Sequence, residues 1–291
     1  MTDEHGPLAF RVEADAAFGV NSLGLGRAGF PFAAWVSEYN GVHVIGGVAA
    51  RVVDLVDVLE PFAQPVVTVQ SLGHHWFDSE DLRVWRAAEI AREQGVEAVG
   101  HDVTWAGHTE LLALRRTDLS RFLAELYPYN IDIVDAPGPV SAAAADELAL
   151  AVGTRASDGG VLAELPCADL HFSGHDDCYF HIESRDPALP ARVFARLLTL
   201  AVGSALVADG EAVTVVEPHR AFVDTILARS PRWWGPIGAS DPDGTVRLDL
   251  AAGEWRPGVP VPTHADLSIR HDPSTGDWQL TRPESQSHPH T

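Results

Sequence analysis

Residues 65–103 read PVVTVQSLGHHWFDSEDLRVWRAAEIAREQGVEAVGHDV, and this stretch decides the predicted fold. Its first five residues, Pro65 to Val69, are mostly β-branched, which is typical of a buried strand. A helix is predicted from Ser79 to about Glu93, and Gly95 ends it. Val96 to Val103 is again strand-like. The stretch therefore predicts a strand, a helix and a second strand in succession.

The same alternation continues on both sides of this stretch. Upstream, Val42 to Ile45 predicts a short strand and Val48 to Leu59 a helix. Downstream, strand-like segments at 111–114 and 131–134 flank a predicted helix from Asp118 to Leu126. Because a helix between two strands typically makes a crossover connection, the pattern favours parallel neighbours. The predicted fold class is α/β, with mixed α+β as the alternative, built on a mostly parallel or mixed sheet flanked by helices.

The segment DAPGP at 135–139 interrupts the alternation and predicts a domain boundary. We expect an N-terminal α/β unit at 1–136 and a C-terminal α/β unit at 137–282. After Pro231, short segments punctuated by glycine, proline and aspartate predict a β-rich C-terminal end. The polar tail at 283–291 is predicted to be disordered.

The charge of the chain restricts its chemistry and its partners. All 20 basic residues are arginine, against 41 acidic residues, for a formal net charge of −21. The lack of lysine excludes a phosphate-binding P-loop lysine and a Schiff base, and a high-GC genome is its simplest cause. A net charge of this size repels phosphate backbones and anionic membranes, so we expect neither nucleic acid nor membrane as a partner. It suits a basic protein partner, or serves solubility alone.

The N-terminus and the cysteines bear on location. Met1 to Gly6 is acidic and polar, unlike a secretory signal peptide. No apolar run is long enough to span a bilayer. The two cysteines, Cys167 and Cys178, do not indicate a disulfide framework. We therefore expect a cytoplasmic protein.

Residues 24–29, GLGRAG, match the G-x-G-x-x-G pattern of dinucleotide-binding turns. The pattern needs a strand before it and a helix after it. The preceding residues make a poor strand, and a helix beginning near Phe32 would end early at Gly41. Nucleotide binding at Gly24 to Gly29 is therefore a third hypothesis, and an ordinary glycine-rich turn is its alternative.

The densest group of metal-capable side chains lies at 171–183. Its members are His171, His175, Asp176, Asp177, Cys178, His181 and Glu183. Two predicted strands, 168–172 and 178–183, are joined by a polar turn, and strand alternation places Tyr179, His181 and Glu183 on one face. Zinc or a similar divalent ion binds three such ligands and keeps a position for water. The alternative is a polar hairpin whose aspartates cap backbone amides.

Two loops that carry histidine form a second group. His74 and His75 follow the predicted strand at 65–69, and His101, Asp102 and His108 follow or end the next one. Ligands in α/β sheets bind beyond the carboxyl ends of strands, so a general acid/base pair is one interpretation. The alternative is that these side chains fill a loop-covered edge of the core.

The remaining candidate is the aromatic pair Trp233-Trp234, which either anchors a partner or plugs the core. With no catalytic motif evident, the leading hypothesis is an acidic cytosolic protein that binds another macromolecule, for example in an immunity or antitoxin-like role. Whether the protein is an enzyme is left open. The alternative hypothesis is a metal-dependent hydrolase-type enzyme that uses the histidine-rich segments.

Overall fold

The structure is a computed structural model, and the residues that it describes are 8–10, 33–48, 65–70, 87–105, 108–124, 131–136, 139–154, 160–166, 168–174, 179–206, 213–228, 245–248, 267–272 and 274–281. The chain divides into two compact units, each made of separate stretches of sequence. Unit 1 comprises residues 1–35, 47–50 and 191–291, and unit 2 comprises 36–46 and 51–190. These units do not follow the boundary predicted between residues 136 and 137, which stays a prediction.

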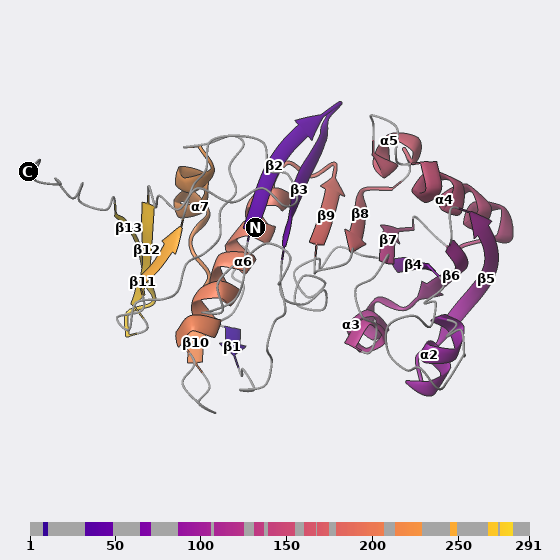
Figure 1. The fold of residues 1–291 in the computed structure, drawn as a ribbon, viewed down its shortest axis with the longest axis horizontal. Coiled ribbons are helices and arrows are strands. Elements are labelled where there is room, and N and C mark those ends of the chain that lie inside the picture. The colour runs from indigo at the N-terminus through magenta and orange to yellow at the C-terminus, as the bar shows by residue number, and fades with distance from the viewer. Residues whose placement is uncertain are drawn as a thin grey trace, which may run out of the picture. The chain divides into compact units, whose positions relative to one another are not determined.

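The main sheet has eight strands in the order β2-β3-β9-β8-β7-β4-β6-β5 (Figure 1). Their bounds are β2 Ala33–Tyr39, β3 Val42–Val48, β4 Pro65–Gln70, β5 Ala98–Trp105, β6 His108–Leu114, β7 Ile131–Asp135, β8 Leu170–Gly174 and β9 Tyr179–Ser184. The described helices of unit 2 are α2 Ala87–Glu93, α3 Arg116–Ala124, α4 Ala142–Thr154 and α5 Val161–Glu164.

The predicted mostly parallel or mixed sheet is wrong. Every strand pair of this sheet with a described register is antiparallel: β4 with β6 and β7, β5 with β6, β7 with β8, and β8 with β9. Strands β4 and β5 do run parallel to each other, as their connection through α2 predicts. Strand β6 separates them, because only residues 106 and 107 lie between β5 and β6, which permits a hairpin but no crossover. The result is a split βαβ arrangement, and β6-α3-β7 repeats it around β4.

A second hairpin joins β2 and β3. Asn40 and Gly41 occupy its turn with φ angles of 48° and 74°, the left-handed conformation that two-residue hairpins require. The short helix expected to begin near Phe32 is therefore wrong, since residues 33–39 form a strand. An Asn-Gly pair next to a β-branched run is a hairpin signal that the helix interpretation passed over.

Helices cover both faces of this sheet. The apolar residues Val66, Leu111 and Val134 share one face and pack in a core cluster with α4 and α5. The neighbouring Glu110 points to the opposite face, where its carboxylate accepts a hydrogen bond from Ala87 N–H at the start of α2, at 2.6 Å. The first of these faces matters for the site, because polar side chains interrupt its apolar surface.

Among its described residues, unit 1 has two smaller antiparallel sheets and two helices. Their bounds are β1 Leu8–Phe10, β10 Val213–Val215, β11 Thr245–Leu248, β12 Leu267–Asp272, β13 Asp277–Thr281, α6 Leu189–Leu206 and α7 Arg220–Leu227. Strand β1 pairs with β10, and β11-β12-β13 form the other sheet. The β12–β13 hairpin, with Gly276 at φ 75° in its turn, agrees with the β-rich C-terminal end predicted after Pro231. Within the described residues, no helix has the length and apolar character needed to cross a bilayer.

Candidate metal centre

The β8–β9 hairpin aligns the candidate ligands in pairs. His171 lies directly opposite Glu183, and Ser173 lies directly opposite His181. Because opposite residues of an antiparallel pair project to the same face, all four side chains share one face of the sheet. The predicted pair of strands and the shared face of His181 and Glu183 are both confirmed.

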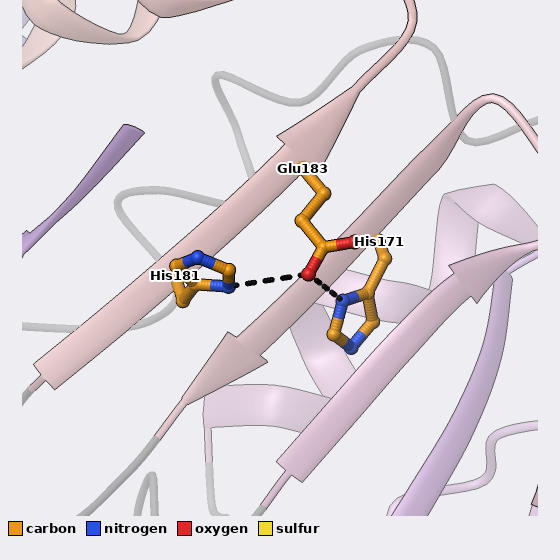
Figure 2. Close-up of side chains that lie close together, drawn as sticks. All are labelled: His171, His181 and Glu183. Atoms are coloured by element: carbon orange, nitrogen blue, oxygen red, sulfur yellow. Dashed lines mark ion pairs between the residues drawn. The ribbon is translucent and has the colours of Figure 1, made fainter. Parts of the chain in front are cut away.

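The carboxylate of Glu183 lies between the two imidazoles (Figure 2). Its Oε1 atom is 3.7 Å from His171 Nδ1 and 3.5 Å from His181 Nδ1. The three ligand atoms all lie within 4.8 Å of one another. His171 is fully buried and Glu183 nearly so, whereas 34% of the His181 side chain is exposed. The cluster is therefore closed on the sheet side and accessible at His181.

A second carboxylate, that of Asp132, contacts the ring nitrogen of His171 that faces away from Glu183. His171 Nε2 lies 2.9 Å from Asp132 Oδ1, and both side chains are fully buried. Strand β7 supplies Asp132, which pairs in register with Ser173 and so lies on the same face. If Nε2 donates its hydrogen to Asp132, the lone pair of Nδ1 points toward Glu183. A carboxylate that fixes the tautomer of a histidine in this way is a usual companion of metal ligands.

Sequence reasoning missed Asp132. A signal was present, since an acid in the apolar run IDIV at 131–134 must be buried if that run forms a central strand. A buried acid needs a partner, and that partner is found only when the pairing of β7 with β8 is known.

Glu183 and Arg185 hold the first turn of short helix α5 by hydrogen bonds. Glu183 accepts hydrogen bonds from Val161 N–H at 3.3 Å and Leu162 N–H at 2.9 Å. Just past the end of β9, the Arg185 guanidinium donates to the carbonyl oxygens of Leu162 at 2.6 Å and Ala168 at 3.1 Å. These contacts fix the rotamer of Glu183 and leave Oε1 directed at the histidines.

Tyr39 and Gly160 complete the surroundings of Glu183. Gly160 precedes α5 with φ 69°, and a Cβ atom on it would collide with the Tyr39 hydroxyl and with Glu183 Oε1, the latter at 2.5 Å. The hydroxyl of Tyr39 therefore lies beside the carboxylate. Burial and the negative charge of Glu183 raise the pKa of Tyr39 above its usual value. Sequence reasoning missed both residues, because neither lies near the histidine-rich hairpin in the chain.

The electrostatics of the metal-free site are those of a buried ion pair. Burial alone would lower the pKa of His171, but the hydrogen bond to Asp132 and the negative charges of Asp132 and Glu183 outweigh it and raise that pKa. Burial alone would raise the pKa of Glu183, but the neighbouring His171 and the Leu162 amide lower it to about 2. Without metal, a proton on His171 thus balances the carboxylates on either side.

The donor set suits a transition-metal ion. Two imidazole nitrogens and one carboxylate oxygen are the ligands that zinc and non-haem iron take in three-ligand sites. Ligand atoms around a tetrahedral zinc ion are about 3.4 Å apart, given bonds of about 2.1 Å. The Glu183–His181 and Glu183–His171 separations of 3.5 and 3.7 Å are close to that value.

The predicted acid/base group at the other end of the sheet does not converge on this cluster. His101 shares the face and the register row of His181, but β6, β4, β7 and β8 lie between their strands. Five inter-strand spacings amount to about 24 Å. Asp102 is exposed on the edge strand β5, and only the backbone of His108 is described, at the start of β6. A role for these three residues stays a prediction.

Several predicted site residues lie outside the described residues. They are His74 and His75, the turn residues His175, Asp176 and Asp177, the aromatic pair Trp233 and Trp234, and the glycine-rich segment Gly24 to Gly29. The hypotheses attached to them stay predictions.

Comparisons with known proteins add no relative to this geometry. No protein-family model, no curated protein and no solved structure matches the chain significantly. The function of this chain is therefore inferred from the geometry of the site.

Proposed function

We propose that this protein is a metal-dependent enzyme of the hydrolase type, with a transition-metal ion held by His171, His181 and Glu183. One observation supports the proposal above all others. Three ligand atoms converge within 4.8 Å on one face of a hairpin, and a buried carboxylate, Asp132, orients one of the imidazoles toward the other two ligands.

The positions of His171 Nδ1 and Glu183 Oε1 favour a positive charge between these two atoms. With the Nε2 hydrogen directed at Asp132, the Nδ1 atom at 3.7 Å from Glu183 Oε1 is beyond ordinary hydrogen-bond distance. A lone pair opposite a buried carboxylate oxygen is repulsive in a low-dielectric interior. Either a second proton on His171 or a bound cation resolves it. The partial exposure of His181 allows an ion to enter from solvent.

Hydrolysis is the chemistry that such a site supports best. A metal ion with three protein ligands polarises a substrate oxygen and lowers the pKa of bound water. In this chain, Asp132 keeps the His171 imidazole oriented, and the two α5 amides keep Glu183 from rotating away. The exposed side of His181 is where water and substrate would approach.

Metal content tests the binding half of the proposal. Elemental analysis of the untagged protein should find near-stoichiometric zinc or iron. Titration of the metal-free protein should give one site, and His181→Ala should weaken it at least tenfold. His43→Ala is the matched control, because His43 is also part-exposed on the sheet and pairs with Glu38 at 3.5 Å. Equal metal binding by the two variants would refute the assignment of ligands.

Hydrolytic activity tests the other half. Chromogenic carboxylic and phosphoric esters should be hydrolysed by the metal-loaded protein, and the activity should disappear with a chelator and return with metal. The His43→Ala variant should keep this activity and His181→Ala should lose it. A protein that holds metal but hydrolyses no ester of either class would leave a binding role in place of the enzymatic one.

Two predictions from composition are independent of this site. The net charge of −21 still favours a basic protein partner, in an immunity or antitoxin-like role. A cytoplasmic location is proposed from the low cysteine content, two residues in the whole sequence. Retention of a basic protein from native lysate on the immobilised chain, lost at high salt, would support the first.

A further inference from the structure

We propose that Tyr39 is the fourth protein donor of this metal centre, and that its phenolate oxygen makes ferric iron the preferred ion. The inference rests on the proposed metal site and specifies its cofactor.

The first observation is the position of the Tyr39 hydroxyl. The oxygen is buried beside the Glu183 carboxylate, and among the described residues no group stands in good hydrogen-bond geometry to it. Buried tyrosine hydroxyls usually have a partner, and an exception in a folded protein calls for a water, an ion or a functional role. Tyr39 packs against the core cluster formed with α4 and α5, so its ring is held in place while its oxygen faces the carboxylate.

The second observation is the glycine beside it. A Cβ on Gly160 would contact both the Tyr39 oxygen and Glu183, with Glu183 Oε1 at 2.5 Å and Glu183 Cδ at 2.8 Å. Because both oxygens lie close to the position of that Cβ atom, the Tyr39 oxygen and Glu183 Oε1 are neighbours. That same Oε1 faces His171 Nδ1 and His181 Nδ1. Tyr39 thus places a fourth donor atom beside Oε1, which the two histidine nitrogens already face.

The chemistry of four such donors differs from that of three. Two imidazoles and one carboxylate serve zinc and ferrous iron alike. A phenolate adds a second anionic oxygen, and hard anionic oxygens favour a highly charged ion. Tyrosinate is an established ligand of iron in proteins. With Asp132 behind His171, the site would surround a trivalent ion with negative charge.

The test uses the full-length, metal-free protein loaded with ferric nitrilotriacetate. Tyrosinate bound to ferric iron gives a charge-transfer band in the visible spectrum and phenolate modes in resonance Raman. We expect both in the wild-type protein at one iron per chain. Tyr39→Phe should abolish them and weaken ferric iron binding at least tenfold, while zinc binding changes less. Because Tyr39→Phe removes only the hydroxyl and keeps the ring that packs against the core cluster, the metal-free variant should fold normally.

A glycine pair supplies the matched structural control. Gly160→Ala should reduce the charge-transfer band, because its Cβ would displace Tyr39 and Glu183. Gly95→Ala imposes similar backbone strain, with φ 67° against 69°, but nothing lies within 4 Å of its Cβ. We expect Gly95→Ala to keep the band. Equal loss in both variants would attribute the effect to backbone strain and overturn the inference.

The outcomes separate this inference from the proposed function. A wild-type protein that binds zinc or iron through the histidines without a tyrosinate signature overturns the role of Tyr39 alone. A signature that persists in Tyr39→Phe assigns it to another tyrosine and also overturns the inference. A protein that binds neither ion overturns the proposed function and this inference together.

Discussion

Two buried histidines, one in each compact unit, meet opposite environments. His171 lies between the carboxylates of Asp132 and Glu183, and their influence raises its pKa above the ordinary value. His271, on β12, is only 1% exposed, and neither ring nitrogen has a hydrogen-bond partner among the described residues. Burial, only partly offset by the nearby Asp272, lowers its pKa.

The difference shows how neighbours, rather than burial, decide what a buried histidine does. The ring of His271 packs on Trp278 at a centroid distance of 4.9 Å, and the Trp278 indole N–H donates to Val216 O at 2.8 Å. This environment is that of an apolar core residue. The environment of His171 is a polar network inside an otherwise apolar face, which is typical of a functional site.

The largest expected effect breaks the polar network. In the metal-free protein, Glu183→Gln removes a buried charge from His171 and should lower the free energy of unfolding by about 3 kcal/mol. Urea denaturation at neutral pH measures the change. Glu38→Gln is the control, because the carboxylate of Glu38 is mostly exposed beside His43 and its removal should cost less than about 1 kcal/mol. Similar losses in the two variants would contradict a special role for the buried pair.

Metal addition should sharpen the comparison. An ion at one hundred times its dissociation constant stabilises the folded state by about 2.7 kcal/mol. We expect this gain in the wild type and in His271→Leu, and its loss in Glu183→Gln, measured as a shift of the thermal unfolding midpoint. Removal of the ion by a chelator should reverse it. A metal-dependent shift that survives Glu183→Gln would place the ion elsewhere.

Replacing His271 should have a smaller effect of opposite sign. His271→Leu removes a buried polar ring that has no hydrogen-bond partner in the described part of the chain, and it should stabilise the protein by about 1 kcal/mol. His171→Leu should destabilise it, because two carboxylates then lose their buried partner. His219→Leu, at an exposed position before α7, should change stability by less than about 0.5 kcal/mol. Chemical denaturation of the three variants decides the order.

The smallest effects are slopes of stability against pH in the metal-free protein. His271 has a lowered pKa, so its neutral form contributes stability above pH 6.5 that is lost as the pH falls toward the folded-state pKa. His171 has a raised pKa, so its contribution is present below pH 6.5 and is lost as the pH rises through the folded-state pKa. Each proton gives at most about 1.4 kcal/mol per pH unit.

The free energy of unfolding, measured against pH in the wild type and in His271→Leu, separates the contributions of the two histidines. In His271→Leu, the free energy of unfolding should fall less steeply just below pH 6.5 than in the wild type. Its pH dependence above pH 6.5 should be unchanged. In the wild type and in His271→Leu alike, the stability contributed by Glu183 should disappear as the pH falls from 4.5 to about 2. The reason is that the folded-state pKa of Glu183 is lowered to about 2. An unchanged decline below pH 6.5 in His271→Leu would show that another group titrates there.

Local structure was largely predictable and strand order was not. The strand-like character of 65–69 and 131–134 follows from β-branched composition, and the described part of α2 ends before Gly95 as predicted. β6 lies between β4 and β5 because only two residues separate β5 from β6, and the predicted strands at 96–103 and 111–114 left a longer gap that hid this hairpin. The Asn40-Gly41 pair is a sequence signal for a two-residue hairpin, and the helix predicted near Phe32 overlooked it.

Part of the candidate site was also predictable. His171, His181 and Glu183 lie within one hairpin, where period-two alternation and pairing register bring side chains together. Asp132, Tyr39 and Gly160 come from three other segments of the chain. Asp132 comes close to this cluster through the pairing of β7 with β8, and Gly160 and Tyr39 through the position of α5 next to Glu183. No local sequence pattern could predict these contacts.

The sequence by itself determined the charge, the local elements and the histidine-rich hairpin, because composition and short-range periodicity are properties of neighbouring residues. The tertiary structure decided the antiparallel order of the sheet and the enclosure of Glu183 by residues from distant segments. It also decided that one buried histidine is paired with carboxylates and the other with an indole. Those outcomes depend on contacts between residues far apart in the chain, where burial and charge act through space.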